Sequence, residues 1–336
     1  MRCAKRVAIA MIPVFFSLWG SGQKSDTPLL VHGKKYVMGT VFEIVAYDKS
    51  SEHASMAIEK AFQEIVRVDD LLSNYKAESA LSKLNRSAHF HAQEVPPDVY
   101  RVIETSVEFS RLSKGKFDVS VAPLVNLWKA ALSGEAAPSA AQEEKARGCV
   151  GYEKIELTPP DRITFHSDCM QLDLGAIGKG YAVDRAAATL QSCGIHDALI
   201  NAGGSTMVAM GSPPGQTAWL VHLRDPSGKV DPQVMLKDES VSTSEQTPAS
   251  LLDDHAGGHI IDPDSGRPLK TQFAVSVIAN TGTLSDALST TLLLLGPEEG
   301  KGLLNRIPGV SAIWVSPQAQ TETVTRGPRI LLGARS

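Results

Sequence analysis

The sequence predicts an α+β fold, made mostly of antiparallel sheets with packed helices. Two observations support this fold class. Segments with strand and helix patterns do not follow one another as a regular β-α-β series, which a doubly wound parallel sheet would require. The chain also has an alternating segment followed by a long amphipathic helix near its start, and two short alternating segments near its end. We expect a single domain over residues 23–336, and a division into two lobes around a central cleft is left open.

In the first half of the chain, hydrophobic periodicity places the elements. Residues 35–47 alternate apolar and polar side chains and predict a strand, and residues 51–72 have the three- and four-residue apolar spacing of a helix. A second helical pattern covers residues 99–112 and is closed by Lys114-Gly115. The polar residues 133–148, rich in Ala, Glu, Ser and Pro, indicate a surface excursion without a catalytic role.

The second half reads as short strands around two helices. Strand patterns occupy residues 152–174, around Pro159-Pro160, and Cys149 and Cys169 flank this hairpin region, so that they are candidates for a disulfide. A helix over residues 182–190 follows, closed by Gly194, and a second, buried helix covers residues 285–295. Further strands are predicted at residues 198–201, 219–223 and 273–279, with a closing hairpin at 312–315 and 321–325.

The N-terminus has the layout of a secretory signal. Arg2, Lys5 and Arg6 precede an apolar run over residues 7–19, and small residues follow at 20–22. The run is short for a membrane span, which needs about 20 apolar residues. We therefore expect residues 1–22 to be a signal peptide and the mature chain to be exported to a bacterial periplasm. Cys3 lies before the apolar run, so it is not placed as the lipid-bearing cysteine that follows a signal.

The overall charge limits the classes of partner. A formal net charge of −4 argues against binding to a nucleic-acid backbone, which calls for a basic face. A small ligand with a few phosphates needs no such excess of positive charge.

A glycine-rich loop lies at residues 172–184, which read LDLGAIGKGYAVD. Gly175, Gly178 and Gly180 follow an alternating segment and lead into a helical pattern, so we expect a strand, a loop and a helix. Unpaired N–H groups and the helix dipole would favour a phosphate there. The spacing matches neither the Walker A loop nor the dinucleotide fingerprint, and a tight turn without a ligand remains an alternative.

Asp286 and Thr290 lie four residues apart on the predicted buried helix, so their side chains share one face. A carboxylate and a hydroxyl are hard oxygen donors of the kind that Mg²⁺ prefers. A purely structural reading is also open, in which Asp286 caps the first turn and Thr290 bonds back to the helix backbone.

Seven motifs follow one another along the chain: Met-Gly-Thr at residues 38–40 and the segments 72–85, 117–128, 172–184, 201–205, 259–266 and 285–291. In this order they resemble the ApbE family of flavin transferases. The resemblance implies an ApbE-like α+β fold. It places the metal ligands at Asp286, Thr290 and Ala176, and because Ala176 has no donor side chain, its ligand would be the backbone carbonyl.

The same resemblance implies roles for further residues. It assigns flavin binding to Met38, Tyr75, Lys116, Phe117, Asp118, Asp173, Lys179 and Ile261, and makes His259 the candidate general base. Packing alone is the competing explanation for Met38 and Ile261, and a solvated side chain for Lys179. Asp262 is interpreted as the start of the turn at residues 263–266.

The resemblance implies a reaction in which FAD is cleaved at its pyrophosphate with Mg²⁺, FMN moves to a Ser or Thr hydroxyl of a protein, and AMP departs. The implied acceptors are flavoprotein subunits of membrane redox complexes, which would bring the chain close to a membrane surface. Two alternatives remain: a pyrophosphatase that yields FMN and AMP, and a non-catalytic periplasmic FAD-binding protein. The chain departs from the family pattern at Glu245, where glycine is usual, and an added charge there would bear on turnover or acceptor choice.

Overall fold

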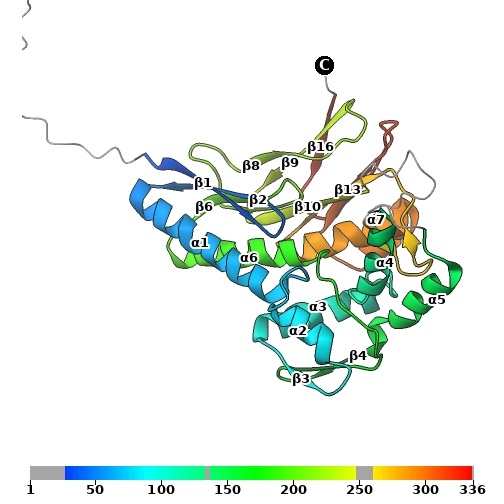
Figure 1. Cartoon of the computed structure of the whole chain (residues 1–336). Helices are drawn as coiled ribbons and strands as arrows, with labels where there is room; N and C mark the ends of the chain where they lie inside the picture. The colour runs from blue at the N-terminus through cyan, green and yellow to red at the C-terminus, as the bar shows by residue number, and fades with distance from the viewer. Residues whose placement is uncertain (1–26, 133–136, 247–259, 335–336) are drawn as a thin grey trace, which may run out of the picture.

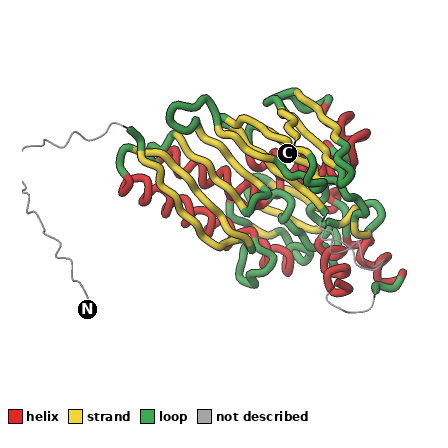
Figure 2. The backbone as a smooth tube through the Cα atoms, turned by 90° about the horizontal axis from the view of Figure 1, so that it is seen from above, coloured by secondary structure: helices red, strands yellow, loops and turns green. Residues whose placement is uncertain are grey.

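An eight-stranded antiparallel sheet forms the centre of the structure, a computed structural model that describes residues 27–132, 137–246 and 260–334. Its strands lie in the order β1-β2-β6-β7-β10-β13-β14-β15. Figure 2 shows the strands side by side, seen from above. This sheet confirms the predicted α+β class. The strands are β1 (Leu29–Val37), β2 (Thr40–Asp48), β6 (Asp197–Ala202), β7 (Thr206–Met210), β10 (Glu239–Glu245), β13 (Ala274–Ala279), β14 (Ser311–Val315) and β15 (Thr321–Thr325).

Residues 35–47 were predicted as one strand, and this was wrong because they contain the end of β1, a two-residue turn and most of β2, which form a hairpin. β1 and β2 pair in register from Leu29 opposite Asp48 to Val37 opposite Thr40. The two residues between them, Met38 and Gly39, have φ of 52° and 73°. Two successive left-handed residues make the tight turn whose twist matches that of a hairpin.

Three helices cover one face of the sheet, in the layer below the strands in Figure 1. They are α1 (Ser51–Leu72), α6 (Gly178–Ser192) and α7 (Gly282–Leu304). The bounds of α1 confirm the prediction, since its apolar stripe is buried and the Ser50 side chain caps its first turn by accepting from the His53 N–H at 3.2 Å. Gly296 has φ of 70° and interrupts α7 just before Pro297.

A small three-stranded sheet covers the opposite face. It consists of β8 (Trp219–His222), β9 (Val230–Leu236) and β16 (Ile330–Ala334), in the order β16-β9-β8. Trp219, Val234 and Ile330 pack there against Val241 and Ile313 of the large sheet. The large sheet is therefore buried on both faces in this region.

The chain between α1 and α6 forms a group of elements on the far side of the helix layer (Figure 1). Residues 133–148 were expected to be a surface excursion, and α5 occupies the second half of that stretch, started by a capping box of Ser139 and Gln142. The β4–β5 hairpin and a disulfide between Cys149 and Cys169 bear out the candidate pairing. The elements are α2 (Ala80–Ser87), β3 (Gln93–Glu94), α3 (Pro97–Leu112), α4 (Ala122–Leu132), α5 (Ala140–Cys149), β4 (Ile155–Thr158) and β5 (Arg162–Phe165).

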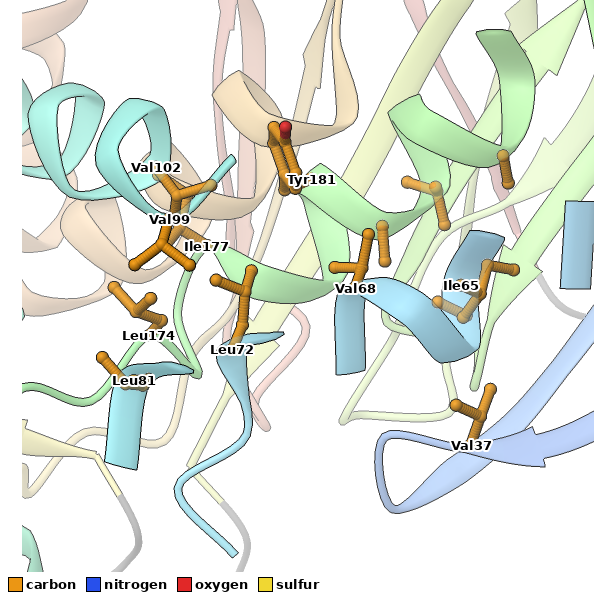
Figure 3. Close-up of a cluster of buried hydrophobic side chains, with 14 of the residues drawn as sticks. Val37, Ile65, Val68, Leu72, Leu81, Val99, Val102, Leu174, Ile177 and Tyr181 are labelled. Carbon is orange, nitrogen blue, oxygen red and sulfur yellow. The ribbon is translucent and has the colours of Figure 1, made fainter. Parts of the chain in front are cut away.

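One hydrophobic cluster joins this group to the helix layer. Figure 3 shows Leu81, Val99 and Val102 packed near Ile177 and Tyr181 of the glycine loop and α6. The start of α6 therefore packs against buried apolar side chains, which hold the glycine loop in place. Within the described part of the chain, no helix is long and apolar enough to cross a membrane.

Candidate active site

The glycine loop is fixed by side-chain amides in place of the strand that the sequence predicted. The Leu172 N–H donates to Asn85 Oδ1 at 2.8 Å, and the Leu172 carbonyl accepts from Asn74 Nδ2 and Asn85 Nδ2, both at 3.0 Å. These two asparagines occupy the hydrogen-bonding positions that a neighbouring strand would fill, so the expected strand at residues 172–174 was wrong. The helix itself was predicted correctly, and it begins earlier, at Gly178.

Gly180 brings the first turn of α6 against α7. The Gly180 N–H donates to Asp286 Oδ2 at 2.8 Å, and a Cβ on Gly180 would lie 2.2 Å from the carbonyl oxygen of Gly282. Only glycine permits this approach. Gly180 and Asp286 belong to two separate sequence motifs, and the structure brings them into contact.

The carboxylate of Asp286 is buried, and its exposed fraction is 5%. Burial raises the pKa of Asp286, and the nearby charge of Lys179 and the hydrogen bond from Gly180 oppose that rise. The hydroxyl of Thr206 donates to Asp286 Oδ1 at 3.3 Å. Thr281 caps α7, so Asp286 does not have the capping role that the structural alternative gave it.

Asp184 ties the two helices together at the start of α7. Its carboxylate accepts from the N–H groups of Gly282 at 2.6 Å and Thr283 at 2.8 Å, and burial raises the pKa of this group. A side chain on α6 thus accepts from two further N–H groups in the first turn of α7, in addition to the cap from Thr281. This arrangement sets the position of Asp286 one turn further along.

Thr290 does not bond back to its own helix. Its Oγ1 lies 3.0 Å from Ser244 Oγ on β10, whereas the next residue, Thr291, donates to the Ala287 carbonyl at 2.7 Å. Thr290 is half-buried and presents its hydroxyl on the same face of α7 as Asp286. The second part of the structural alternative therefore fails as well.

The donors at this point fit a hard cation such as Mg²⁺. Asp286 and Thr290 offer a carboxylate and a hydroxyl oxygen, and no hydrogen bond to the Ala176 carbonyl is found among the described residues. The structure contains no group of three His, Cys, Asp or Glu side chains suited to a metal within its described ranges. A cation here would therefore need neutral oxygens and ligand phosphates to complete its coordination, which is the habit of Mg²⁺.

Met38 lies beside the glycine loop, although β1 and β2 are far from it in sequence. A Cβ on Gly178 would be 3.7 Å from Met38 Cε, and Met38 has the left-handed φ that residues other than glycine seldom adopt. Strained backbone of this kind is concentrated at functional sites. The structure thus brings Met38, Lys179 and Asp286 around one loop.

Tyr75 and Asp173 line a pocket of about 390 Å³ next to the loop. Tyr75 is 84% exposed, and Lys129 Nζ lies 4.6 Å from its ring centroid. Asp173 accepts from the Gly175 N–H at 2.7 Å, which closes the first turn of the loop. Asp286 and Thr290 are not among the residues that line this pocket. An exposed ring with a cation above it is suited to stacking with a flat ligand.

Lys116, Phe117 and Asp118 lie in a more enclosed setting. Phe117 packs edge-on against Phe109, and Asp118 accepts from the Ser120 hydroxyl at 2.6 Å and the Tyr152 N–H at 3.0 Å. Burial raises the pKa of Asp118 despite these hydrogen bonds. Phe117 and Asp118 therefore shape the loop around Lys116 from within the protein.

Lys116 reaches the turn after β11 (Ile261–Asp262), which pairs with β12 (Arg267–Pro268). Its Nζ lies 3.0 Å from Asp262 and 2.7 Å from Asp264. Burial disfavours the charged lysine, and the two carboxylates outweigh it and raise the pKa of Lys116. Asp262 also accepts from the Gly266 N–H through its carbonyl at 2.9 Å, which confirms its predicted role in the turn. Ile261 is buried beside Leu124 and Trp128.

Two further positions, His259 and Glu245, concern the predicted site. His259 lies outside the described residues. Glu245 is the last residue of β10, and its carboxylate forms two hydrogen bonds with Arg224, at 2.8 and 2.6 Å. Neighbouring residues of a strand point to opposite faces, so Glu245 points away from the face on which Ser244 meets Thr290.

Sequence reasoning missed several residues that hold the site together. Asn74 and Asn85 fall within a motif that was noted without a role for them. Thr206 and Ser244 are hydroxyl residues on strands, and hydroxyl residues are common on solvent-facing strands. The distinguishing signal is the alternation Ser240, Ser242, Ser244 on β10, since a buried strand face is usually apolar.

The fold and the site define a class of protein: an α+β protein in which a glycine-rich helix N-terminus contacts a buried carboxylate, next to a pocket lined by Tyr75. The model of the ApbE family matches residues 38–314. The chain therefore belongs to the ApbE family.

Relatives and solved structures agree with this assignment. The chain is 30% identical over 301 residues to an FAD:protein FMN transferase of Treponema pallidum, covering 84% of this chain and 83% of the relative. It is 28% identical over 347 residues to the Escherichia coli K12 protein of the same name, covering 95% and 97%. The crystal structure of the Pseudomonas stutzeri flavinyl transferase ApbE in its apo form superimposes with a TM-score of 0.77 at 26% identity, covering 89% of this chain and 97% of that one.

Proposed function

We propose that the chain is an FAD:protein FMN transferase, which moves FMN from FAD to a Ser or Thr hydroxyl of a target flavoprotein and releases AMP. The observation that carries the proposal is the contact between the glycine loop and Asp286. A helix N-terminus that attracts phosphate is held within hydrogen-bonding distance of a buried carboxylate. The family membership and the names of the relatives support the same reaction.

In this reaction the acceptor oxygen bonds to the phosphorus of the FMN half, and the bond from that phosphorus to the bridging oxygen breaks. The bridging oxygen leaves with AMP. Lys179 would hold the pyrophosphate beside the N-terminus of α6, whose Gly180 N–H donates to Asp286, and Tyr75 and Met38 would pack on the flat ring system. His259 is proposed as the base that takes the hydroxyl proton, on the resemblance of its motif alone.

Asp286, Thr290 and the Ala176 carbonyl are proposed to hold Mg²⁺, which would neutralise charge on the phosphates when bound. The protein holds the ligand oxygens of Asp286 in a fixed orientation before the ion binds. Gly180 and Thr206 orient the two carboxylate oxygens, with donor distances of 2.8 and 3.3 Å. Pre-oriented ligands lower the ordering cost of binding.

We further propose export and a periplasmic acceptor. The signal-like residues 1–22 support export, and the implied acceptors are subunits of membrane redox flavoproteins. Mass spectrometry of the chain recovered from a periplasmic fraction tests this: a mature N-terminus near residue 23 supports export, and retention of residues 1–22 in the cytosol contradicts it.

Glu245 is compatible with activity, although the family usually has glycine there. Arg224 neutralises its charge, and its side chain lies on the face of β10 opposite Thr290. We expect Glu245→Gly to change the rate of FMN transfer by less than about fivefold, because an ion pair with an exposed arginine contributes less than about 1 kcal/mol. A large gain in transfer would instead show that Glu245 restrains the wild-type enzyme.

The test of the proposed function uses the purified protein with FAD and Mg²⁺, alone and with a Thr-containing domain of a membrane redox flavoprotein. AMP release and the flavin fluorescence of the denatured acceptor band are measured together. Covalent flavin on the acceptor, with AMP release that depends on the acceptor, supports the transferase.

The other outcomes identify the alternatives. Equal AMP release without an acceptor makes the protein a pyrophosphatase, since water then replaces the hydroxyl. Bound FAD with no AMP under either condition makes it a non-catalytic FAD-binding protein.

A further inference from the structure

A ladder of hydroxyl groups fills the interface between β10 and α7. Ser240, Ser242 and Ser244 project from one face of β10, and each lies within hydrogen-bonding distance of a hydroxyl on α7. The first two meet Ser285, and Ser244 meets Ser289 at 2.8 Å and Thr290 at 3.0 Å. A helix packed on a sheet normally buries apolar side chains here, so the ladder needs an explanation beyond packing.

The hydrogen bonds at the Thr290 end have one consistent direction. A hydroxyl has a single hydrogen to donate. Ser289 Oγ lies 2.9 Å from the Asp286 carbonyl oxygen, which can only accept, so the hydrogen of Ser289 is used there. Ser244 must therefore donate to Ser289, and Thr290 must donate to Ser244.

This direction determines what Thr290 offers to a ligand. Its hydrogen points into the protein toward Ser244, and its remaining lone pairs are left for another partner. A hydroxyl that coordinates a cation through oxygen needs this orientation. With the reverse direction, the hydrogen of Thr290 would point away from Ser244 and repel the cation.

We propose that Ser244, with its direction set by Ser289, is a positioning residue that fixes the Thr290 hydroxyl as a ready-made cation ligand. The inference rests on the proposed function, because it assumes that Thr290 is a metal ligand. It adds that hydroxyls of β10 and α7 that do not contact the ion contribute to the metal affinity. Partners of metal ligands commonly contribute about 10- to 100-fold to metal affinity.

A matched control lies on the other face of β10, where this strand pairs with β13. Thr243 Oγ1 and Ser276 Oγ form a hydroxyl pair at 2.7 Å, and Ser276 is buried, as Ser242 and Ser289 of the ladder are, whereas Ser244 is half-buried. Ser276→Ala removes a comparable hydrogen bond between β10 and β13, on the face opposite Thr290.

The experiment titrates Mn²⁺ into the purified protein in the presence of AMP and follows free Mn²⁺ by electron paramagnetic resonance. AMP offers a phosphate and has no flavin to transfer. We expect the Kd for Mn²⁺ to rise by about 10- to 100-fold in Ser244→Ala and Ser289→Ala. Ser244→Thr, which retains a hydroxyl, and Ser276→Ala should both bind like the wild type. Melting temperatures without Mn²⁺ should be similar in Ser244→Ala and Ser276→Ala, which separates the metal effect from folding.

The outcomes distinguish the inference from the proposed function. If the wild type binds Mn²⁺ and Ser244→Ala binds it equally well, or Ser276→Ala weakens it as much, the positioning role is wrong and the proposed function stands. If the wild type binds no Mn²⁺ and transfers FMN without a divalent ion, the metal assignment itself falls, and the positioning role falls with it.

Discussion

Gly180→Ala tests the close approach of α6 to α7 on which the site depends. The added Cβ would lie 2.2 Å from the Gly282 carbonyl oxygen and 2.7 Å from Asp286 Cβ. Ordinary contacts of a Cβ begin at 3.4 Å. The closest atom belongs to the backbone, so no side-chain rotation relieves the clash, and the two helices must separate by about 1 Å.

The magnitude follows from three contributions. Overpacking costs about 1–3 kcal/mol. Loss of the hydrogen bond from the Gly180 N–H to a carboxylate costs about 1.5–3 kcal/mol. The higher helix propensity of alanine stabilises the folded protein by about 1 kcal/mol relative to glycine. The net loss is about 3 kcal/mol, and for a chain of 336 residues this lowers the melting temperature by about 4 °C.

Differential scanning calorimetry measures this shift, and Gly178→Ala is its matched control. Gly178 lies two residues earlier, and a Cβ there would meet only Met38 Cε at an ordinary 3.7 Å. We expect Gly178→Ala to melt at or slightly above the wild-type temperature and Gly180→Ala to melt clearly below it. A Gly180→Ala protein that melts within about 1 °C of the wild type would refute the reasoning about the helix crossing.

Three further predictions concern the site and the acid stability. Asp286→Ala should abolish Mn²⁺ binding and FMN transfer while circular dichroism stays native, and Thr290→Ala should be milder; full activity of Asp286→Ala across a Mg²⁺ titration contradicts the metal assignment. His259→Asn should leave FAD affinity nearly unchanged in a fluorescence titration and slow transfer by about 10²- to 10⁴-fold, and equal losses of both would place His259 in ligand recognition. Burial raises the pKa of Asp98, but hydrogen bonds from Tyr181 and Arg67 outweigh burial and lower the pKa of Asp98 in the folded protein below 3.8. The ionised Asp98 therefore stabilises the folded protein above about pH 3.8, and this stabilisation is lost as the pH falls through the pKa of the folded state. Urea midpoints should therefore fall below about pH 4 in the wild type, and an equally steep fall in Asp98→Asn would show that other groups are responsible.

The elements that the sequence predicted well are those that local periodicity determines. Helix α1 has the bounds of its apolar repeat, because one stripe faces the core along its whole length. The β1–β2 hairpin was read as one strand because its turn is Met38-Gly39, and methionine in a left-handed conformation has no recognisable turn signature. Strand β16 was missed because its partner, β9, lies about 100 residues earlier in the chain.

The site shows the same division between local and long-range information. The pairing of Asp286 with Thr290 follows from helical spacing and was predicted, whereas the contact of Asp286 with Gly180 joins residues 106 apart. No local pattern reports such a contact. The strand expected at Leu172 is absent for a related reason. The side chain of the distant Asn85 forms the hydrogen bonds with the Leu172 backbone that a neighbouring strand would otherwise form.

The disulfide between Cys149 and Cys169 makes the covalent state of the protein depend on where it is produced. It closes a loop with a sequence separation of 20 residues and ends three residues before Leu172, where the glycine loop begins. Opening a loop of this size gives the unfolded chain about 3 kcal/mol of additional conformational freedom. Its formation removes two electrons and two protons, so a reducing cytosol yields a dithiol with the same sequence and a less stable fold. Preparations made there should be assayed for free thiols before the activities of variants are compared.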